Sequence, residues 1–326
     1  MKKRALLQQN YRGILVAILV GLLAIWIKDM VGSPIVDPLL VALTIGICIR
    51  SFVRFNPSYL AGFAAAPSIF IPIGIIFYGA ANLNFVEFAS VDSDFIFLIF
   101  IVFIVYILAT LSLSSIFCLK EKVGYLITSG STICGASAIV ITSKSIDAEP
   151  DDVSQSLIPV FISALIGLFI ILPRLSAYFG ISELEYGVLS GAVLQFTGFV
   201  KASVAHHSAD IQTIALSVKA VRYLGLLFVI PLFASLLKGK FYVPWYLLAF
   251  VGAGIIFTFM PEQYSAILKP LSKATLTLLW SIAMGAIGLN ANIKSVFSID
   301  GLKACIVSLL SLLIAIGVFL TGILLL

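Results

Sequence analysis

Two basic residues, Lys219 and Arg222, lie well inside the long apolar segment 211–237. Residues three apart share one face of a helix. A charge in the middle of a membrane helix costs roughly 2.5–3.5 kcal/mol, so it persists mainly where it faces a cavity or a partner. No Asp or Glu lies centrally in any apolar segment. A structural role, with both side chains reaching the surface or an acid, is the alternative, but we expect the pair to bind a small anion and expect no intramembrane carrier for a cation.

The segment 124–142 carries small and polar residues at its centre, where positions 128–137 hold five hydroxyl residues, two glycines and a cysteine. Small residues alone are typical of close helix packing. The clustered hydroxyls favour instead a broken helix that lines a substrate cavity. The half-helix after such a break would present free N–H groups and a positive dipole to an anion.

Two further stretches contribute to the same predicted site. The glycine-rich stretch 284–292 predicts a second break, and the segment 186–204 carries two polar residues that share a face only if Gly198 lets the helix distort. The adjacent histidines 206 and 207 are more typical of a solvated loop than of a metal pair, so no metal or cofactor is expected. The predicted substrate-binding residues are Ser129, Gly130, Ser131, Thr132, Cys134, Gly135, Ser137, Gln195, Thr197, Lys219, Arg222, Gly285, Gly288 and Asn290.

The composition identifies the setting in which these residues act. Of 326 residues, 61% are hydrophobic and 11% are charged, against about 25% charged in a soluble domain. This balance excludes a water-soluble enzyme, a disordered chain and a nucleic-acid-binding protein. We attribute the net charge of +5 to basic residues in the loops that set the membrane topology. The four cysteines form no CxxC pair, which argues against a disulfide framework or a zinc site.

The hydropathy pattern predicts a polytopic all-α membrane protein with about eleven crossing helices. A crossing helix needs about 20 apolar residues. A signal peptide is the alternative for the first segment, but no small-x-small cleavage pattern follows it, so we expect an uncleaved helix. Two segments are short, which leaves the count at ten or eleven. The segments are 13–27, 34–49, 59–81, 95–118, 124–142, 156–173, 186–204, 211–237, 243–260, 274–290 and 302–325.

The distribution of Lys and Arg predicts the orientation. If the segments alternate, twelve Lys and Arg lie on the side of the N-terminus and five on the other side. Cytoplasmic loops carry the excess of basic residues, so we expect a cytoplasmic N-terminus in a cell (inner) membrane. Lys144 and the acidic loop 147–152 would then lie outside, and Arg174 inside.

The spacing of the two predicted breaks indicates an internal repeat. Gly288 follows Gly135 by 153 residues, close to half the chain. We expect an extra N-terminal helix in 1–33, a first five-helix repeat in 34–180 and a second in 181–326. Five helices per half give the halves opposite orientations, and in such inverted repeats broken helices cross near the midplane.

Several motifs resemble the YeiH-like family of sulfate exporters over roughly residues 34–300. Positions 130–139 read GSTICGASAI and resemble its GTSICGAAAI signature, and VKAVR at 218–222 resembles its VKLTR. AMGAIGLN at 283–290 and DPLL at 37–40 are similar to two further stretches of that family. The resemblance implies an inner-membrane transporter, of bile-acid symporter or sodium/proton antiporter architecture, for sulfate or an organosulfonate. Gln195 and Phe196 stand where relatives carry His and Glu, so a proton relay is not carried over.

We therefore expect a secondary transporter for a small anion, working by alternating access. A sodium- or proton-coupled organic-anion symporter is the alternative. An enzyme is not expected, because no HExxH, GxSxG or phosphate-binding loop occurs. The expected partners are the small anion and the lipid bilayer, with a homodimer and the coupling ion left open, and no nucleic acid.

Overall fold

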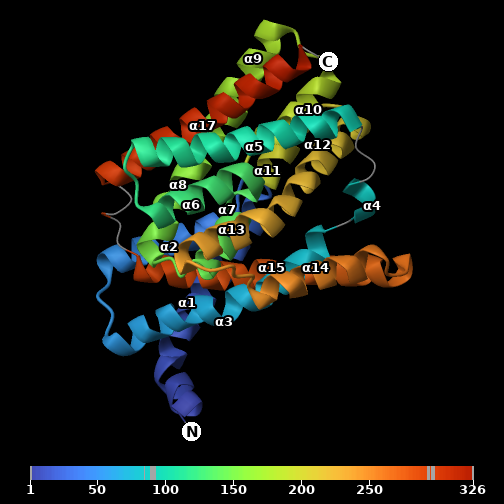
Figure 1. Cartoon of the computed structure of the whole chain (residues 1–326). Coiled ribbons are helices and arrows are strands. Elements are labelled where there is room, and N and C mark those ends of the chain that lie inside the picture. The colour runs from blue at the N-terminus through green and yellow to red at the C-terminus, as the bar shows by residue number, and fades with distance from the viewer. Residues whose placement is uncertain (1, 84, 89–92, 292–293, 295–297, 325–326) are drawn as a thin grey trace.

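The computed structural model describes the chain except residues 1, 84, 89–92, 292–293, 295–297 and 325–326 (Figure 1). The described residues form helices and connecting segments, with no strand among them. In the described part of the chain, seven helices are long and apolar enough to cross a membrane, and two shorter apolar helices, α2 (Pro38–Phe52) and α14 (Trp245–Thr258), accompany them. These findings confirm the predicted all-helical membrane class.

One group of helices, here called the scaffold, brings the two ends of the sequence together. In Figure 1 the blue helices near the N-terminus pack against orange helices from the last third of the chain. The start of α2 is fixed locally, because the carboxylate of Asp37 accepts hydrogen bonds from the N–H groups of Leu39 and Leu40. The scaffold consists of α1 (Lys2–Val31), α2, α3 (Pro57–Asn82), α14 and α15 (Glu262–Asn290).

A helix break was predicted in the stretch 284–292, and this prediction is wrong for residues 284–290, which are helical. Helix α15 runs without interruption to Asn290, and Asn292 lies outside the described residues. The glycines serve packing instead. A Cβ on Gly288 would overlap the carbonyl oxygen of Leu43 in α2, and a Cβ on Gly285 would press on Val20 in α1. The glycines thus let three scaffold helices approach closely, which is the packing alternative for small residues.

The remaining long helices form a second group, here called the hairpin bundle. Figure 1 shows α5 and α17 lying side by side across its outer face. A short helix, α4 (Phe85–Phe88), precedes α5. The bundle contains α5 (Ser93–Ile116), α6 (Glu121–Ser129), α7 (Ala136–Ser145), α8 (Pro150–Ile166), α9 (Leu172–Phe179), α10 (Glu183–Val193), α11 (Thr197–Ser203), α12 (Ala209–Val221), α13 (Leu226–Lys238) and α17 (Ile299–Ile323).

Helices α6 and α7 form a re-entrant hairpin rather than one crossing helix. The Lys122 ammonium, at the start of α6, donates a hydrogen bond of 2.6 Å to the carbonyl oxygen of Asp147, just beyond the end of α7. Lys120 also lies 3.6 Å from Asp152 at the start of α8. The chain therefore returns to the end of the bundle from which it entered. We call residues 121–147 hairpin 1.

Helices α10 and α11 form a second hairpin of the same kind. His207, beyond the end of α11, stacks on Tyr186 with ring centroids 5.3 Å apart. Its Nδ1 lies 3.6 Å from a carboxylate oxygen of Glu183, the first residue of α10. We call residues 183–207 hairpin 2. The two segments predicted to cross, 124–142 and 186–204, thus both turn back.

The two hairpins enter from opposite ends of the molecule. The 30 helical residues from Pro150 to Phe179 connect the base of hairpin 1 to the base of hairpin 2, and a helix of that length spans about 45 Å. We name the two ends by the basic residues nearest them. The Arg50 end holds the base of hairpin 1, the turn between α2 and α3 and the end of α15, at the left of Figure 1. The Lys28 end holds the base of hairpin 2.

This arrangement changes the predicted sides of two basic residues. Lys144 and the acidic loop 147–152 lie at the Arg50 end, because hairpin 1 returns there. Arg174, in α9, lies toward the Lys28 end, at which that helix finishes. The prediction assumed that eleven segments cross in strict alternation, and it therefore placed Lys144 outside and Arg174 inside.

Candidate functional site

The tip of hairpin 1 is an irregular turn built from small residues. Helix α6 passes into one wide turn, Gly130–Cys134, and Gly135 then adopts a φ of 70° and a ψ of −123° before α7 begins. An L side chain rarely adopts such a φ. A Cβ on Gly135 would also press on the ring of Phe196 in hairpin 2. The predicted break in this segment is therefore confirmed, and it is the turning point of a hairpin.

The tip of hairpin 2 is a short extended segment. Helix α10 ends at Val193, Leu194 and Phe196 have extended backbone angles, and α11 begins at Thr197. The distortion expected next to Gly198 is thus present, two to four residues before the glycine. Extended residues cannot continue the helical hydrogen-bond ladder, so carbonyl groups near the end of α10 need other partners.

Lys219 supplies such partners to both tips. Its side chain is fully buried. The ammonium donates to the carbonyl oxygens of Ile133 in hairpin 1 at 2.8 Å, and of Leu194 and Gln195 in hairpin 2 at 2.6 and 2.7 Å. An ammonium has three protons to donate. All three point at backbone carbonyls of the two hairpin tips.

Arg222 extends the same pattern by one turn. Its guanidinium, 3% exposed, donates to the carbonyl oxygens of Ser131 and Thr132 in hairpin 1 at 2.7 and 2.8 Å. It also donates to those of Gly191 and Leu194 in hairpin 2 at 3.1 and 2.7 Å. Together the two cations, which we call the tip clamp, join hairpins that enter from opposite ends.

The electrostatic balance at the tip clamp stays positive. The carbonyl ends of two helices, α6 and α10, point at it, and each contributes about half a negative charge. Two full positive charges are therefore offset by roughly one negative charge. The described residues place no carboxylate in contact with either cation. An anionic ligand was predicted as the partner of this pair, whereas the direct partners in the structure are backbone carbonyl groups.

A buried hydroxyl cluster lies behind the tips, away from the scaffold. The amide nitrogen of Gln195 lies 2.9 Å from the Tyr106 hydroxyl and 3.4 Å from the Ser163 hydroxyl. Ser163 lies 2.7 Å from Ser308, which lies 3.5 Å from Ser131. Among the described residues, the side-chain oxygen of Gln195 has no hydrogen-bond partner. The cluster contains two predicted site residues, Gln195 and Ser131.

Three hydroxyls near the tip of hairpin 1, including those of the predicted site residues Ser129 and Thr132, are engaged by backbone carbonyl groups of α6. Thr128 donates to the carbonyl oxygen of Gly124, and Ser129 to that of Leu126. Thr132 donates to the carbonyl oxygen of Thr128. Their clustering in the sequence therefore reflects hydrogen bonds to the backbone of α6, and a role of Ser129 and Thr132 as anion ligands stays a prediction.

The side of the tips that faces the scaffold carries a second polar set. The Tyr78 hydroxyl in α3 donates to the Cys134 thiol at 3.1 Å and also lies beside the Ser137 hydroxyl. Thr197 in hairpin 2 lies 2.8 Å from the hydroxyl of Tyr223, whose ring packs edge-on against Tyr78. These residues form the contact between the tips and the scaffold.

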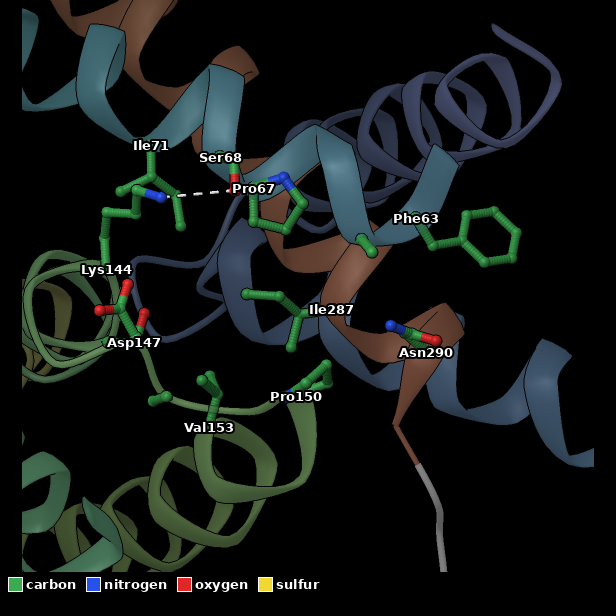
Figure 2. A pocket seen from close by; sticks show the side chains of 13 residues that line it. Phe63, Pro67, Ser68, Ile71, Lys144, Asp147, Pro150, Val153, Ile287 and Asn290 are labelled. Carbon is green, nitrogen blue, oxygen red and sulfur yellow. Dashed lines mark hydrogen bonds between the residues drawn. The ribbon is translucent and has the colours of Figure 1, made fainter. Parts of the chain in front are cut away.

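A cavity of about 240 Å³ opens at the Arg50 end between hairpin 1 and the scaffold (Figure 2). Lys144 crosses it from hairpin 1 and donates a hydrogen bond of 3.4 Å to the Ser68 hydroxyl in α3. Ile71 lies in its lining, and the Ile71 carbonyl oxygen accepts a 3.3 Å hydrogen bond from the Trp280 indole. Trp280 stacks on Tyr78 at 5.1 Å. The cavity is thus separated from the tips by a plug of Ile71, Trp280 and Tyr78.

Most of the predicted site residues lie together at the hairpin tips, and three lie elsewhere. The two hairpin tips, Lys219 and Arg222 come together, whereas Gly285 and Gly288 pack inside the scaffold and Asn290 lines the cavity. Sequence reasoning missed Tyr78, Tyr106, Ser163, Tyr223 and Ser308. Serines within apolar helices were the one signal for two of them, because a buried hydroxyl in lipid-facing sequence needs a partner.

Comparison with known proteins places the chain among membrane proteins. A family described as "Conserved hypothetical protein 698" matches residues 12–308. A UPF0324 membrane protein of Archaeoglobus fulgidus is 28% identical over 292 residues, covering 89% of this chain and 85% of the relative. Similar UPF0324 membrane proteins occur in Brucella melitensis, at 29% identity over 86% of this chain and 80% of the relative, and in Bacillus cereus, at 25% over 92% and 90%.

No solved structure matches this chain significantly. The family description and the names of these relatives state a membrane protein and give no substrate. The match covers both hairpins, the tip clamp and most of the scaffold. This protein therefore belongs to the family described as Conserved hypothetical protein 698, whose relatives named here are UPF0324 membrane proteins.

Proposed function

We propose that this protein is a secondary transporter that moves a small anion across the membrane by alternating access. One observation carries the proposal: two re-entrant hairpins enter from opposite ends and meet at the buried tip clamp. Irregular backbone at membrane depth is tolerated where it is buried in protein or lines a cavity. In secondary transporters such breaks form the substrate site.

The proposed binding site lies where the tips face the scaffold. Cys134, Ser137, Thr197 and Tyr223 contribute from the hairpin bundle, and Tyr78 covers them from α3. The N–H groups at the start of α7 and the residual positive charge of the tip clamp both favour an anion. Lys219 and Arg222 act here through the field they create and by holding the tips. A compact oxyanion, sulfate or a sulfonate, is the proposed substrate class.

The structure corresponds, in this proposal, to a state open toward the Arg50 end. At that end the 240 Å³ cavity separates hairpin 1 from the scaffold. At the Lys28 end hairpin 2 touches the segment that joins the scaffold helices α1 and α2 so closely that a Cβ on Gly198 would overlap the carbonyl oxygen of Pro34. Rocking of the hairpin bundle against the scaffold would exchange these two conditions. The excess of Lys and Arg at the Arg50 end supports a cytoplasmic position for that end.

Binding by the purified protein tests the substrate class. We would titrate sulfate, an alkyl sulfonate and a carboxylate by calorimetry at constant ionic strength, with and without sodium, since salt screens exposed charges. Binding of sulfate or the sulfonate without sodium supports the proposal. An absolute need for sodium would favour the symporter alternative. Binding of a cation and of none of the anions would refute the assignment.

A matched pair of variants tests the location of the site. Ser137→Ala removes a hydroxyl beside Tyr78, whereas Ser311→Ala removes one that donates to the Val307 carbonyl oxygen within α17. A hydrogen bond contributes about 1 kcal/mol, so Ser137→Ala should weaken anion binding about fivefold. The Ser311→Ala protein should bind like the wild type. Equal affinities in both variants would move the site away from the tips.

A further inference from the structure

A second pocket lies at the Arg50 end, outside the cavity of Figure 2. It has a volume of about 750 Å³. Its lining consists of residues around the turn between α2 and α3 and of residues at and beyond the end of α15, namely Arg50, Ser51, Arg54, Phe55, Asn290, Ala291 and Lys294. Three of these residues are basic. Among the lining residues that the structure describes, none is acidic. We call this pocket the basic vestibule.

The basic vestibule and the inner cavity share one residue and one wall. Asn290 lines both spaces. In Figure 2 its amide lies at the side of the cavity opposite Lys144, just before α15 ends. Phe55 lines the vestibule and Phe63 lines the cavity, and their rings pack edge to face with centroids 5.0 Å apart. Asn290 and this aromatic pair thus connect the linings of the two spaces.

We propose that the basic vestibule is a second, weaker anion site that collects the substrate anion and delivers it past Asn290 into the inner cavity. This inference rests on the proposed function, because it assumes that an anion uses the cavity. It adds a site, with Arg50, Arg54 and Lys294 as its ligands, that is distinct from the hairpin tips.

The chemistry of the lining supports an anion in transit. Guanidinium groups present planar donors that match an oxyanion. The basic side chains are exposed or half-exposed, so solvent screens their charges. They therefore bind an anion weakly enough to release it. A basic cleft of this kind raises the local concentration of an anion and its association rate. The neutral amide of Asn290 follows, and it can donate to the same oxygens while holding them less tightly than a full charge.

The phosphate of an anionic lipid could bind to the same basic residues as a free anion. The connection between the vestibule and the cavity distinguishes these two ligands. A lipid headgroup would remain at the vestibule, whereas a free anion can continue past Asn290 into the cavity. An experiment in vesicles of neutral lipid separates the two, because any effect of the vestibule that remains there is independent of lipid phosphate.

Charge-selective thiol labelling tests the vestibule without relying on transport. Ser51→Cys, in a chain whose Cys48, Cys118 and Cys305 are replaced by Ala, places a thiol in the lining. The labelling ratio is the rate with an anionic methanethiosulfonate reagent divided by the rate with a cationic one. At this thiol the labelling ratio should be about ten times that of a free thiol in solution. Arg54→Gln with Lys294→Gln should bring this ratio close to that of a free thiol, and sulfate should slow the anionic reagent.

The matched control is Lys240→Gln, which removes an exposed basic residue at the same end but outside the vestibule. It should leave the labelling ratio unchanged. A ratio that is already that of a free thiol in the parent chain, or one that falls equally in the control, would overturn the proposal. A ratio that sulfate does not lower, but that anionic lipid in the vesicles returns to the value of a free thiol, would assign the pocket to a lipid headgroup, because the headgroup then neutralises the same cations.

Transport then distinguishes this inference from the proposed function. In neutral vesicles at low ionic strength, Arg54→Gln with Lys294→Gln should raise the KM for the anion about threefold to tenfold and leave Vmax unchanged, and the difference should vanish at high ionic strength. Wild-type kinetics in this variant would refute the vestibule while sparing the transporter. Charge-selective labelling without anion transport by the wild type would refute the transporter while sparing the vestibule.

Discussion

Lys219 and Arg222 share an acceptor: both donate to the carbonyl oxygen of Leu194, at 2.6 and 2.7 Å. Like charges three residues apart repel each other. A backbone oxygen between them, with further carbonyls around each, offsets this repulsion without any acidic side chain. The tip of hairpin 2 is thus the point through which the two cations are joined.

Loss of the Arg222 guanidinium should damage both the fold and the site. Arg222→Gln leaves buried carbonyls of the two hairpins without their donor, and breaking a buried charged contact costs about 3–5 kcal/mol. We expect a lower melting temperature in detergent and no detectable anion binding. Arg174→Gln, at the Lys28 end, is the control and should melt like the wild type. An unchanged melting temperature for Arg222→Gln would contradict the tip clamp.

The hairpins make a prediction about sidedness. Single cysteines at positions 122 and 147 should react with a membrane-impermeant thiol reagent from one side, and cysteines at 183 and 207 from the other. Cysteines replacing Arg54 and Lys28 mark the two ends, in a chain whose exposed Cys48 and Cys118 are replaced by Ser. Opposite labelling of positions 122 and 147 would mean that this segment crosses the membrane.

Tyr78 should shield the tip of hairpin 1. Cys134 is 5% exposed and accepts a hydrogen bond from the Tyr78 hydroxyl. In Tyr78→Ala we expect Cys134 to react with N-ethylmaleimide at least tenfold faster, because the part of the plug that contacts the thiol is removed, and we expect sulfate to slow that reaction. Phe250→Ala, which removes the other ring stacked on Tyr78, is the control for general loosening. Equal rates in the two variants would argue against a specific cover.

Gly198 should control closure at the Lys28 end. A Cβ there would overlap the carbonyl oxygen of Pro34, so Gly198→Ala must push hairpin 2 away from the segment between α1 and α2. We expect slower anion exchange in vesicles and faster labelling of a cysteine at position 197 from the Lys28 end. The matched control is Gly317→Ala in α17, where a Cβ meets no atom within 4 Å. Wild-type exchange in Gly198→Ala would show that this contact is not part of the transport cycle.

The sequence predicted the helical class, the break near Gly135 and the burial of Lys219 and Arg222 because these depend on composition and local pattern. It could not predict that two segments turn back, since an apolar run of about 20 residues has the same hydropathy whether it crosses or forms a hairpin. The contact that shows the first of these segments to be a hairpin joins residues far apart in the sequence. It is the hydrogen bond from Lys122 to the carbonyl oxygen of Asp147, 25 residues away.

The partners of the buried cations were hidden for a related reason. Every residue has a carbonyl group, so an acceptor made of backbone leaves no mark in the sequence. Gly285 and Gly288 show the converse, because a glycine pair indicates equally a break and a close helix contact. Only the position of Leu43 and Val20 against α15 selects the contact.

The tip clamp also fixes an order of events during synthesis of the chain. Both hairpins leave the ribosome before Lys219 and Arg222 do, because their residues end at 147 and 207. Until α12 follows, the carbonyl groups at the tips lack their cationic donors, and lipid offers none in exchange. The hairpins must therefore wait at the membrane surface or in the insertion machinery, and their tips can be buried stably only after α12 has been synthesised.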